Sequence, residues 1–152
     1  MDISAKTDYA IRALLAVAAH GDSGPVSVES LVQEQGLPRK FLESILGDLR
    51  RGGLVTSQRG PAGGYTLARP ASQIAIADVF RVVDGPLAEV RGLRPHETTY
   101  DGAARHLPTL WVAVRASLRR VLDDTTIADL LSGDLPAHVT ELAALPDAWR
   151  SR

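Results

Sequence analysis

Hydrophobic positions repeat at helical spacing in three consecutive segments of the first third of the chain. The pattern predicts a helix over Ala5–His20, with Ser4 as its cap, a short helix that Ser27 caps and Gly36 ends, and a third helix to about Arg51. Pro38 suits the first turn of that third helix. The third helix has apolar residues at i, i+3, i+4 and i+7, which predicts one buried face made of Leu42, Ile45, Leu46 and Leu49.

Two short β-prone runs follow the third helix, at 54–58 and 65–68. The loop between them, 59–64, contains three glycines and a proline, which favour a turn, so we expect a two-stranded hairpin. Three helices with only residues 36–38 between the second and the third, followed by a hairpin, have the element order of a winged helix-turn-helix. In such a domain the third helix is the recognition helix, which enters the major groove of DNA.

The second half of the chain contains one strongly periodic segment. A short apolar helix is predicted over 76–83, but no period is visible from Leu87 to Arg105. The next apolar residues advance by steps of 4, 3, 4 and 3, which is the seam of a coiled-coil-like helix of about eighteen residues. Thr126 and Asp129 can then cap a small helix over 127–132, before a proline-containing tail. The seam, which we predict to be a dimer interface, consists of Leu107, Trp111, Val114, Leu118 and Val121.

We therefore expect a mainly α-helical protein with a small β-hairpin wing. The predicted division is a winged helix-turn-helix DNA-binding domain at 1–84, an irregular segment in the position of a sensor loop at 85–105, and a dimerisation helix with a C-terminal tail at 106–152.

Composition is typical of a folded globular protein and excludes several kinds of chemistry. The 152 residues are 45% hydrophobic and 23% charged. The absence of cysteine excludes disulfides, thiolate nucleophiles and cysteine-ligated metal clusters. We find no signal peptide, no stretch of ~20 apolar residues, no phosphate loop and no catalytic triad order. The expectation is a cytoplasmic protein that is not an enzyme and has no membrane partner.

The net charge of −1 conceals an uneven distribution of charge along the chain. Residues 37–69 contain six cations and two anions, a net charge of +4. Residues 123–147 contain six acids and no lysine or arginine, a net charge of −6. The positive segment coincides with the recognition helix and the wing, so double-stranded DNA is the expected partner of this part of the chain.

The outward positions of the third helix supply the candidate DNA contacts. Lys40, Glu43 and Ser44 lie near the helix N-terminus, where Glu43 can accept a hydrogen bond from a cytosine amino group. Basic residues along the helix suit phosphate contacts, and Arg59 in the small-residue loop can enter the minor groove. Structural alternatives remain open: a solvated helix end for Arg50 and Arg51, a tight turn for the glycines, and a salt bridge between Glu43 and Lys40.

Seven short segments of the chain together have a recognisable pattern. They are SAKTDYA at 4–10, GLPRKFLE at 36–43, LRRGGLV at 49–55, RGPAGGY at 59–65, DGP at 84–86, LW at 110–111 and TTIADL at 125–130. In these segments the chain resembles the Rrf2 family of bacterial winged-helix regulators. The resemblance extends over nearly the whole chain and is strongest in the wing.

The resemblance implies a transcriptional regulator, and we expect a repressor. It further implies a homodimer held by the long C-terminal helix, with two recognition helices in adjacent major grooves of an inverted repeat. By the resemblance, Glu43 and Ser44 would read bases, Arg39 and Lys40 would flank them, and Arg59 would occupy the minor groove. The full predicted DNA-binding set is Lys6, Arg39, Lys40, Glu43, Ser44, Arg50, Arg51, Arg59, Gly60, Pro61, Gly63, Gly64 and Tyr65.

Two departures from the family pattern bear on how such a regulator would sense a signal and bind DNA. Cluster-binding members place three cysteines in the segment that here spans 89–105, and this chain has none, so we expect no iron–sulfur cluster and no other cofactor. Asp8 stands where many members have a basic residue. The cysteine-free layout resembles members that act through a protein partner, which suggests a protein or small-molecule effector.

Two other functions remain open from the sequence. One is a winged-helix protein-interaction module that has lost DNA binding, and the other is a ligand or metal sensor that acts through residues 87–105. The nitrogen and oxygen donors of that region match no metal-binding motif, and solvated loop residues explain them better. These donors are His96, Glu97, Asp101 and His106.

Overall fold

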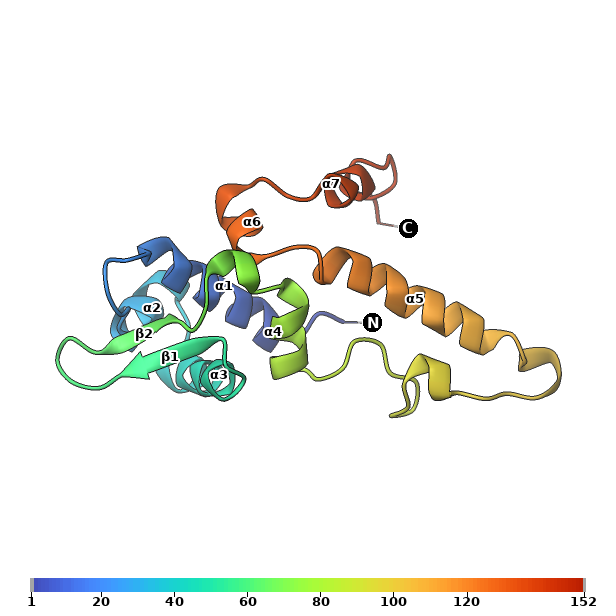
Figure 1. Ribbon diagram of the computed structural model, residues 1–152, viewed down its shortest axis with the longest axis horizontal. Helices are drawn as coiled ribbons and strands as arrows, with labels where there is room; N and C mark the ends of the chain where they lie inside the picture. The colour runs from blue at the N-terminus through green and yellow to red at the C-terminus, as the bar shows by residue number, and fades with distance from the viewer. Residues whose placement is uncertain (1, 152) are drawn as a thin grey trace.

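The N-terminal part of the protein is a three-helix body with a hairpin at its edge, as the computed structural model of residues 2–151 shows (Figure 1). Ser4 caps the first helix by accepting a hydrogen bond from the Thr7 amide at 3.0 Å, and Ser27 caps the second in the same way. Pro38 occupies the N-cap position of the third helix, one residue before its predicted place in the first turn. The elements are α1 (Ala5–His20), α2 (Val28–Gln35), α3 (Arg39–Arg51), β1 (Val55–Gln58) and β2 (Gly64–Leu67).

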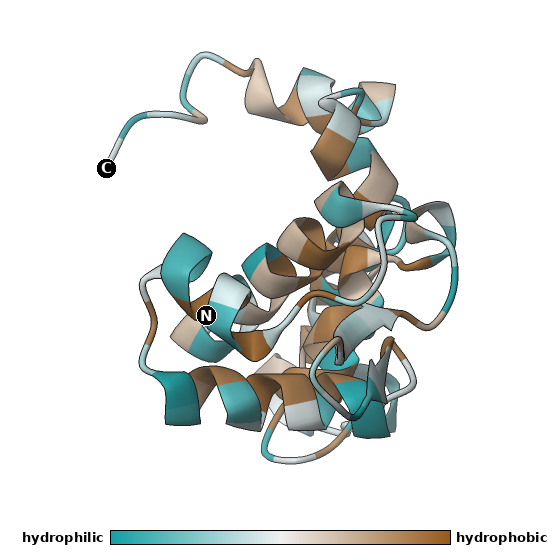
Figure 2. Cartoon of the chain, turned by 90° about the vertical axis from the view of Figure 1, so that its left-hand side faces the viewer, coloured by the Kyte–Doolittle hydropathy of each residue, from teal (hydrophilic) through white to brown (hydrophobic). Residues whose placement is uncertain are grey.

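The hydrophobic core lies between these helices, and α3 supplies its centre. The predicted apolar face of α3 is completely buried: Leu42, Ile45, Leu46 and Leu49 have no exposed surface. A buried side chain of this size stabilises the fold by about 1.5–3 kcal/mol, so this face fixes the rotation of α3 about its axis. The helices in Figure 2 are accordingly banded brown and teal, since each buries only one side. The prediction of a helix that buries one face and presents the other is confirmed.

The remaining elements follow the hairpin through a short 3-10 turn, η1 (Ala71–Gln73). Figure 1 shows α5 projecting away from the body, with the segment between α4 and α5 running out beside it. That segment is irregular as predicted, apart from the short turns η2 (Pro95–Glu97) and η3 (Gly102–Ala104). The helices are α4 (Ile76–Val83), α5 (Leu107–Leu122), α6 (Ile127–Ser132) and α7 (Ala137–Ala143). In the region that the structure describes, no helix combines the length and hydropathy needed to cross a membrane.

Two details of the C-terminal region differ from the prediction. The α5 helix has sixteen residues, slightly fewer than expected, and at 1.5 Å per residue it is about 24 Å long. The tail contains α7, which the sequence pattern did not predict. Pro136 stands at its N-cap, where a proline is compatible with helix initiation, so the proline that indicated an irregular tail instead begins a helix.

The small helix α6 returns to the N-terminal body and completes its core. Ile127 has no exposed surface and packs in the same cluster as Ala10 and Leu14 of α1. Two backbone hydrogen bonds fix the return, from the Ile76 amide to the Thr125 carbonyl at 2.8 Å and from the Ile127 amide to the Ile74 carbonyl at 3.0 Å. The hydrophobic core therefore crosses the predicted boundaries at 84/85 and 105/106.

The start of α1 is fastened to the end of α4 by a second set of contacts. Thr7, which is completely buried, donates a hydrogen bond from its hydroxyl to the Asp84 carboxylate at 2.7 Å. Ser4 donates to the same carboxylate at 2.7 Å. Asp84 is the residue at which the chain leaves the body for the irregular segment, so the departure and the return of that segment are both anchored.

The predicted seam of α5 is partly covered within a single chain. Its five residues (Leu107, Trp111, Val114, Leu118 and Val121) are all half-buried, and α5 lies against η2. The Trp111 indole nitrogen is buried and has no hydrogen-bond partner within residues 2–151. By contrast, Leu110 and Val112 are 52% and 43% exposed. The apolar period of α5 thus reflects packing inside the protomer at least in part, and further apolar side chains remain on its outer surface.

Candidate nucleic-acid interface

The outer face of α3 combines charged and polar side chains on a rigid helix. Because Leu42, Ile45, Leu46 and Leu49 point inward and Phe41 packs against the core, the exposed positions of α3 lie on its opposite face. The exposed residues include every one that the sequence predicted for contact with DNA: Arg39, Lys40, Glu43, Ser44, Arg50 and Arg51.

Arg39 connects the recognition helix to α2. Its guanidinium donates a hydrogen bond to Glu43 Oε1 at 2.9 Å and another to Glu29 Oε2 at 2.8 Å. The hydrogen bond to Glu43 is the main reason why the pKa of Arg39 is raised. The salt-bridge partner of Glu43 is therefore Arg39, one turn earlier on α3, and not Lys40 as the sequence alternative suggested. In this arrangement Arg39 orients the carboxylate that was predicted to read a base.

Asp48 holds two of the other predicted cations. Lys6 from α1 and Arg51 from α3 both form ion pairs with its carboxylate, whose side chain is only 21% exposed. The hydrogen bond from Lys6 is the largest influence on Asp48 and lowers the pKa of its carboxyl group. Lys6 and Arg51 are thus partly neutralised by a neighbouring acid, and their attraction for a phosphate is reduced.

Three of the cations predicted to contact DNA form no ion pair with another residue between 2 and 151. Lys40, Arg50 and Arg59 have no ion pair or side-chain hydrogen bond within the described residues 2–151. Arg39, Arg50 and Arg59 line one shallow hollow of about 360 Å³ between α3, the start of α2 and the wing. A groove with guanidinium groups from separate elements suits a curved phosphate backbone, since such contacts position a protein on DNA.

The wing has the predicted hairpin geometry, with Val55 paired to Leu67 and Gln58 to Gly64. At two glycine positions of the wing, any larger residue would collide with neighbouring backbone atoms. A Cβ atom at Gly63 would lie 2.3 Å from the Gln58 carbonyl oxygen, and one at Gly64 would lie 2.3 Å from the Val26 carbonyl oxygen. The tight turn therefore accounts for Gly63, and the close approach of the Val26 backbone accounts for Gly64, without any contribution from DNA. Gly60 and Pro61 are exposed near the tip.

Tyr65 has a structural position in the wing. Its backbone exchanges two hydrogen bonds with Val26, at 2.9 Å and 2.8 Å, which adds a short third segment beside β2. The half-buried side chain packs against both clusters of the hydrophobic core. These contacts are sufficient to explain an aromatic residue here, and they give no support to the predicted contact with DNA.

The acidic departure, Asp8, lies on the exposed side of α1. Its carboxylate is 3.8 Å from the Arg12 guanidinium, one turn further along the helix. Asp8 is therefore compensated locally, and its effect on an approaching phosphate is smaller than that of an isolated acid.

The donor set of the chain does not fit an iron–sulfur cluster. The whole sequence has no cysteine to supply thiolate ligands. Within residues 2–151, no three histidine or acidic side chains lie close enough together to hold a metal ion, and this includes His96, Glu97, Asp101 and His106. No step in the function of this protein is therefore assigned to such a cluster.

Sequence reasoning missed the partners that hold these cations. The pairing of Asp48 with Arg51 was visible as an i,i+3 spacing, but its contact with Lys6 depends on how α1 and α3 pack. Glu29 lies ten residues before Arg39, on a different helix, and nothing in the local sequence indicated their contact. The anchoring of Ser4 to Asp84 spans eighty residues and is equally a tertiary feature.

Known proteins with the same arrangement are DNA-binding regulators. The chain matches the Rrf2 family, described as "Iron-dependent Transcriptional regulator", over residues 3–133. It is 47% identical over 143 residues to Rv1287 of Mycobacterium tuberculosis strain H37Rv, which is named as an HTH-type transcriptional regulator. That alignment covers 94% of this chain and 89% of the other protein.

Two solved structures share the fold. CymR of Bacillus subtilis, the global cysteine regulator, matches with a TM-score of 0.75 and 34% identity, over 88% of this chain and 98% of that one. IscR of T. potens matches with a TM-score of 0.69 and 34% identity, over 88% of each chain. The winged helix-turn-helix prediction is confirmed, and so is the expectation that the protein is not an enzyme. The chain belongs to the Rrf2 family of DNA-binding transcriptional regulators.

Proposed function

We propose that this protein is a repressor that binds an inverted-repeat operator as a homodimer in the bacterial cytoplasm. The observation that supports the proposal best is a group of cations along α3 and the wing, Lys40, Arg50 and Arg59, that have no ion-pair partner among residues 2–151. Arg50 and Arg59 line a hollow of about 360 Å³. A bound repressor would block transcription by occupying its operator.

The two kinds of DNA contact are assigned to different residues. Glu43 and Ser44, exposed on the first half of α3, would read base edges in the major groove, and Glu43 would accept from a cytosine amino group through the carboxylate that Arg39 orients. Arg50 would contact phosphates, while Arg59 would enter the minor groove from the wing. Lys6 and Arg51 would face the phosphates, but Asp48 holds both and reduces their contribution in the wild-type protein.

The dimer would form along α5. The seam residues of this helix are half-buried within the protomer, and Leu110 and Val112 are apolar side chains that remain exposed. A two-fold axis beside α5 would place the two recognition helices on the same face of DNA, in half-sites about 34–36 Å apart.

A genome-wide binding selection followed by gel-shift titration tests this function. We expect wild-type protein to enrich an inverted repeat. Arg59→Ala should weaken binding to operator and to unrelated DNA by similar factors, because the minor groove distinguishes base pairs far less than the major groove that α3 would read. Glu43→Ala should lower discrimination at one base pair by ~1–3 kcal/mol, with a smaller change in non-specific affinity.

Arg91→Ala, a change in the irregular segment that removes one positive charge outside the interface, serves as the matched control and should leave both affinities unchanged. Failure to enrich any DNA, with a protein partner co-purifying instead, would support the interaction-module alternative. An Arg59→Ala protein with wild-type affinity and salt dependence would refute the role of the wing.

A further inference from the structure

A second cluster of cations lies far along the chain from the DNA-binding elements. Four arginines line a hollow of about 270 Å³ between the end of α4, the irregular segment and α5. Two further residues, Pro86 and Leu87, form its apolar wall. The arginines are Arg81 of α4, Arg94 of the irregular segment, and Arg115 and Arg119 of α5.

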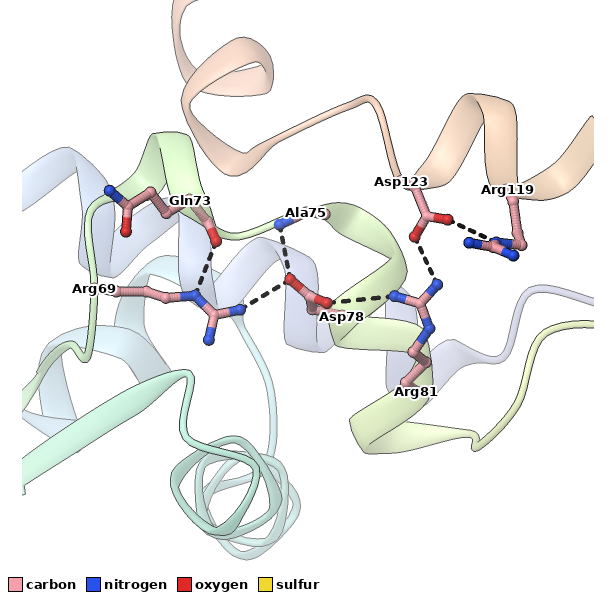
Figure 3. A network of polar contacts seen from close by, with 7 residues as sticks. All are labelled: Arg69, Gln73, Ala75, Asp78, Arg81, Arg119 and Asp123. Atoms are coloured by element: carbon pink, nitrogen blue, oxygen red, sulfur yellow. Dashed lines mark hydrogen bonds and ion pairs between the residues drawn. The ribbon is translucent and has the colours of Figure 1, made fainter.

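Two of these arginines are already paired. Asp123 accepts a hydrogen bond from Arg81 at 2.6 Å and another from Arg119 at 2.9 Å. Arg81 also contacts Asp78 at 3.3 Å, and Asp78 accepts a further bond from Arg69 at 2.9 Å. Figure 3 shows these side chains as a continuous row of alternating charge, from η1 across α4 to the end of α5.

The other two arginines have no such partner. The side chains of Arg94 and Arg115 make no hydrogen bond or ion pair with any residue between 2 and 151. The hollow thus contains two uncompensated guanidinium groups beside a pair whose charge is shared with Asp123. Like charges gathered in one concave site repel one another, and an anion placed between them removes that repulsion.

The shape and chemistry of the hollow limit what it can hold. A guanidinium group presents paired N–H donors that match the oxygen atoms of a phosphate or a carboxylate. The volume is near the lower end for small-molecule sites, which excludes a nucleotide-sized ligand. The wall of Pro86 and Leu87 suits a short apolar segment.

We propose that this hollow is a binding site for a compact organic dianion, either a small phosphate ester or a short dicarboxylate. The two negative charges pair with Arg94 and Arg115, and the carbon skeleton lies against Pro86 and Leu87. Binding of the dianion does not depend on the DNA-binding function proposed above.

Thermal unfolding of the full-length protein without DNA tests the proposal. The probes are inorganic phosphate and succinate, each compared with potassium chloride at equal ionic strength. One or both should raise the wild-type Tm in a concentration-dependent manner, because a ligand that binds only the folded state stabilises it. The probe with the larger effect identifies the phosphate or the dicarboxylate as the preferred class.

Substitutions locate the site. Arg94→Gln and Arg115→Gln should each weaken the apparent affinity for the effective probe about tenfold or more. One control variant should retain it: Arg120→Gln, at an exposed position of α5. Should either Gln variant fail to fold, ¹⁵N spectra of wild-type arginine side chains during the phosphate and succinate titrations supply the same information.

The proposal is overturned by any of three results. The first is a Tm effect of phosphate and succinate no larger than that of chloride. The second is equal loss of the effect in the Arg120→Gln control, which would show a diffuse electrostatic response. The third is a titration in which the Arg94 and Arg115 side-chain resonances do not move.

Discussion

We expect Asp48 to weaken the attraction of α3 for DNA, and Asp48→Asn tests this expectation. The carboxylate pairs with both Lys6 and Arg51, two cations of the proposed interface. The substitution removes the negative charge, keeps the size of the side chain and releases both cations. Each new phosphate contact adds about 0.9 to the slope of log affinity against log salt, and is worth roughly eightfold in affinity at 0.1 M salt relative to 1 M.

We therefore expect the slope for non-specific duplex DNA to steepen by about 0.9 if one cation is released onto a phosphate and about 1.8 if both are. Fluorescence anisotropy across a series of potassium chloride concentrations measures this slope. Asp22→Asn is the charge-matched control, because Asp22 is an exposed acid in the turn after α1, away from α3. An unchanged slope in Asp48→Asn, or an equal change in Asp22→Asn, would refute the idea that Lys6 and Arg51 face the DNA backbone.

The same substitution has a signature in the dependence of stability on pH. The hydrogen bond from Lys6 lowers the pKa of Asp48 in the folded state below its usual value of 3.8. The unfolded chain therefore takes up a proton first as the pH falls, so this stabilisation is complete above about pH 5 and is lost as the pH falls through the folded-state pKa. Ion pairs near the protein surface contribute at most ~1 kcal/mol. On acidification, the free energy of unfolding of the wild type should therefore fall by up to ~1 kcal/mol more than that of Asp48→Asn. Urea unfolding at several pH values measures the difference, and parallel curves for the two proteins would contradict it.

Two further predictions concern the fold that supports the interface. Gly64→Ala should destabilise the protein by about 2 kcal/mol or more, because the new Cβ would collide with the Val26 carbonyl oxygen; Gly60→Ala, with open space around its Cβ, should cost only about 1 kcal/mol from backbone strain. Equal losses in urea unfolding would exclude the steric explanation. Ile127→Ala should cost about 2–5 kcal/mol and lower the Tm of the whole N-terminal body, whereas Leu131→Ala, at a half-exposed position of α6, should change it little. A small effect of Ile127→Ala would show that α6 is dispensable for the core.

Local patterns in the sequence predicted the elements well where the signal lay within a few residues. The buried face of α3 and the caps at Ser4 and Ser27 depend on spacing along one segment, and each was found. The burial of Ile127 was not predicted, because its partners on α1 are more than a hundred residues away in sequence. The α7 helix was not predicted, because a proline is found both where a helix ends and where a helix begins.

The candidate interface was predicted as a set of residues but not as an electrostatic arrangement. Sequence position showed which side chains of α3 face outward. It could not show that Arg39 is shared between Glu29 and Glu43, nor that Arg50 has no partner among residues 2–151. Both facts depend on how neighbouring elements pack. The seam of α5 illustrates the same limit: a helical period indicates that a face is covered, but it does not say whether the cover is another protomer or the same chain.

The anchoring of the chain at Asp84 and at Thr125 has a consequence for how such a protein can diversify. The chain between these two residues lies outside the N-terminal body. The hydrogen bond from Thr7 to Asp84 fixes its first end, and the hydrogen bond from the Ile76 amide to the Thr125 carbonyl fixes its second end. We expect changes of length or chemistry in the irregular segment 85–105, outside α5, to leave the frame that positions α3 undisturbed. A protein built in this way can exchange one irregular segment for another while it keeps the same third helix and wing.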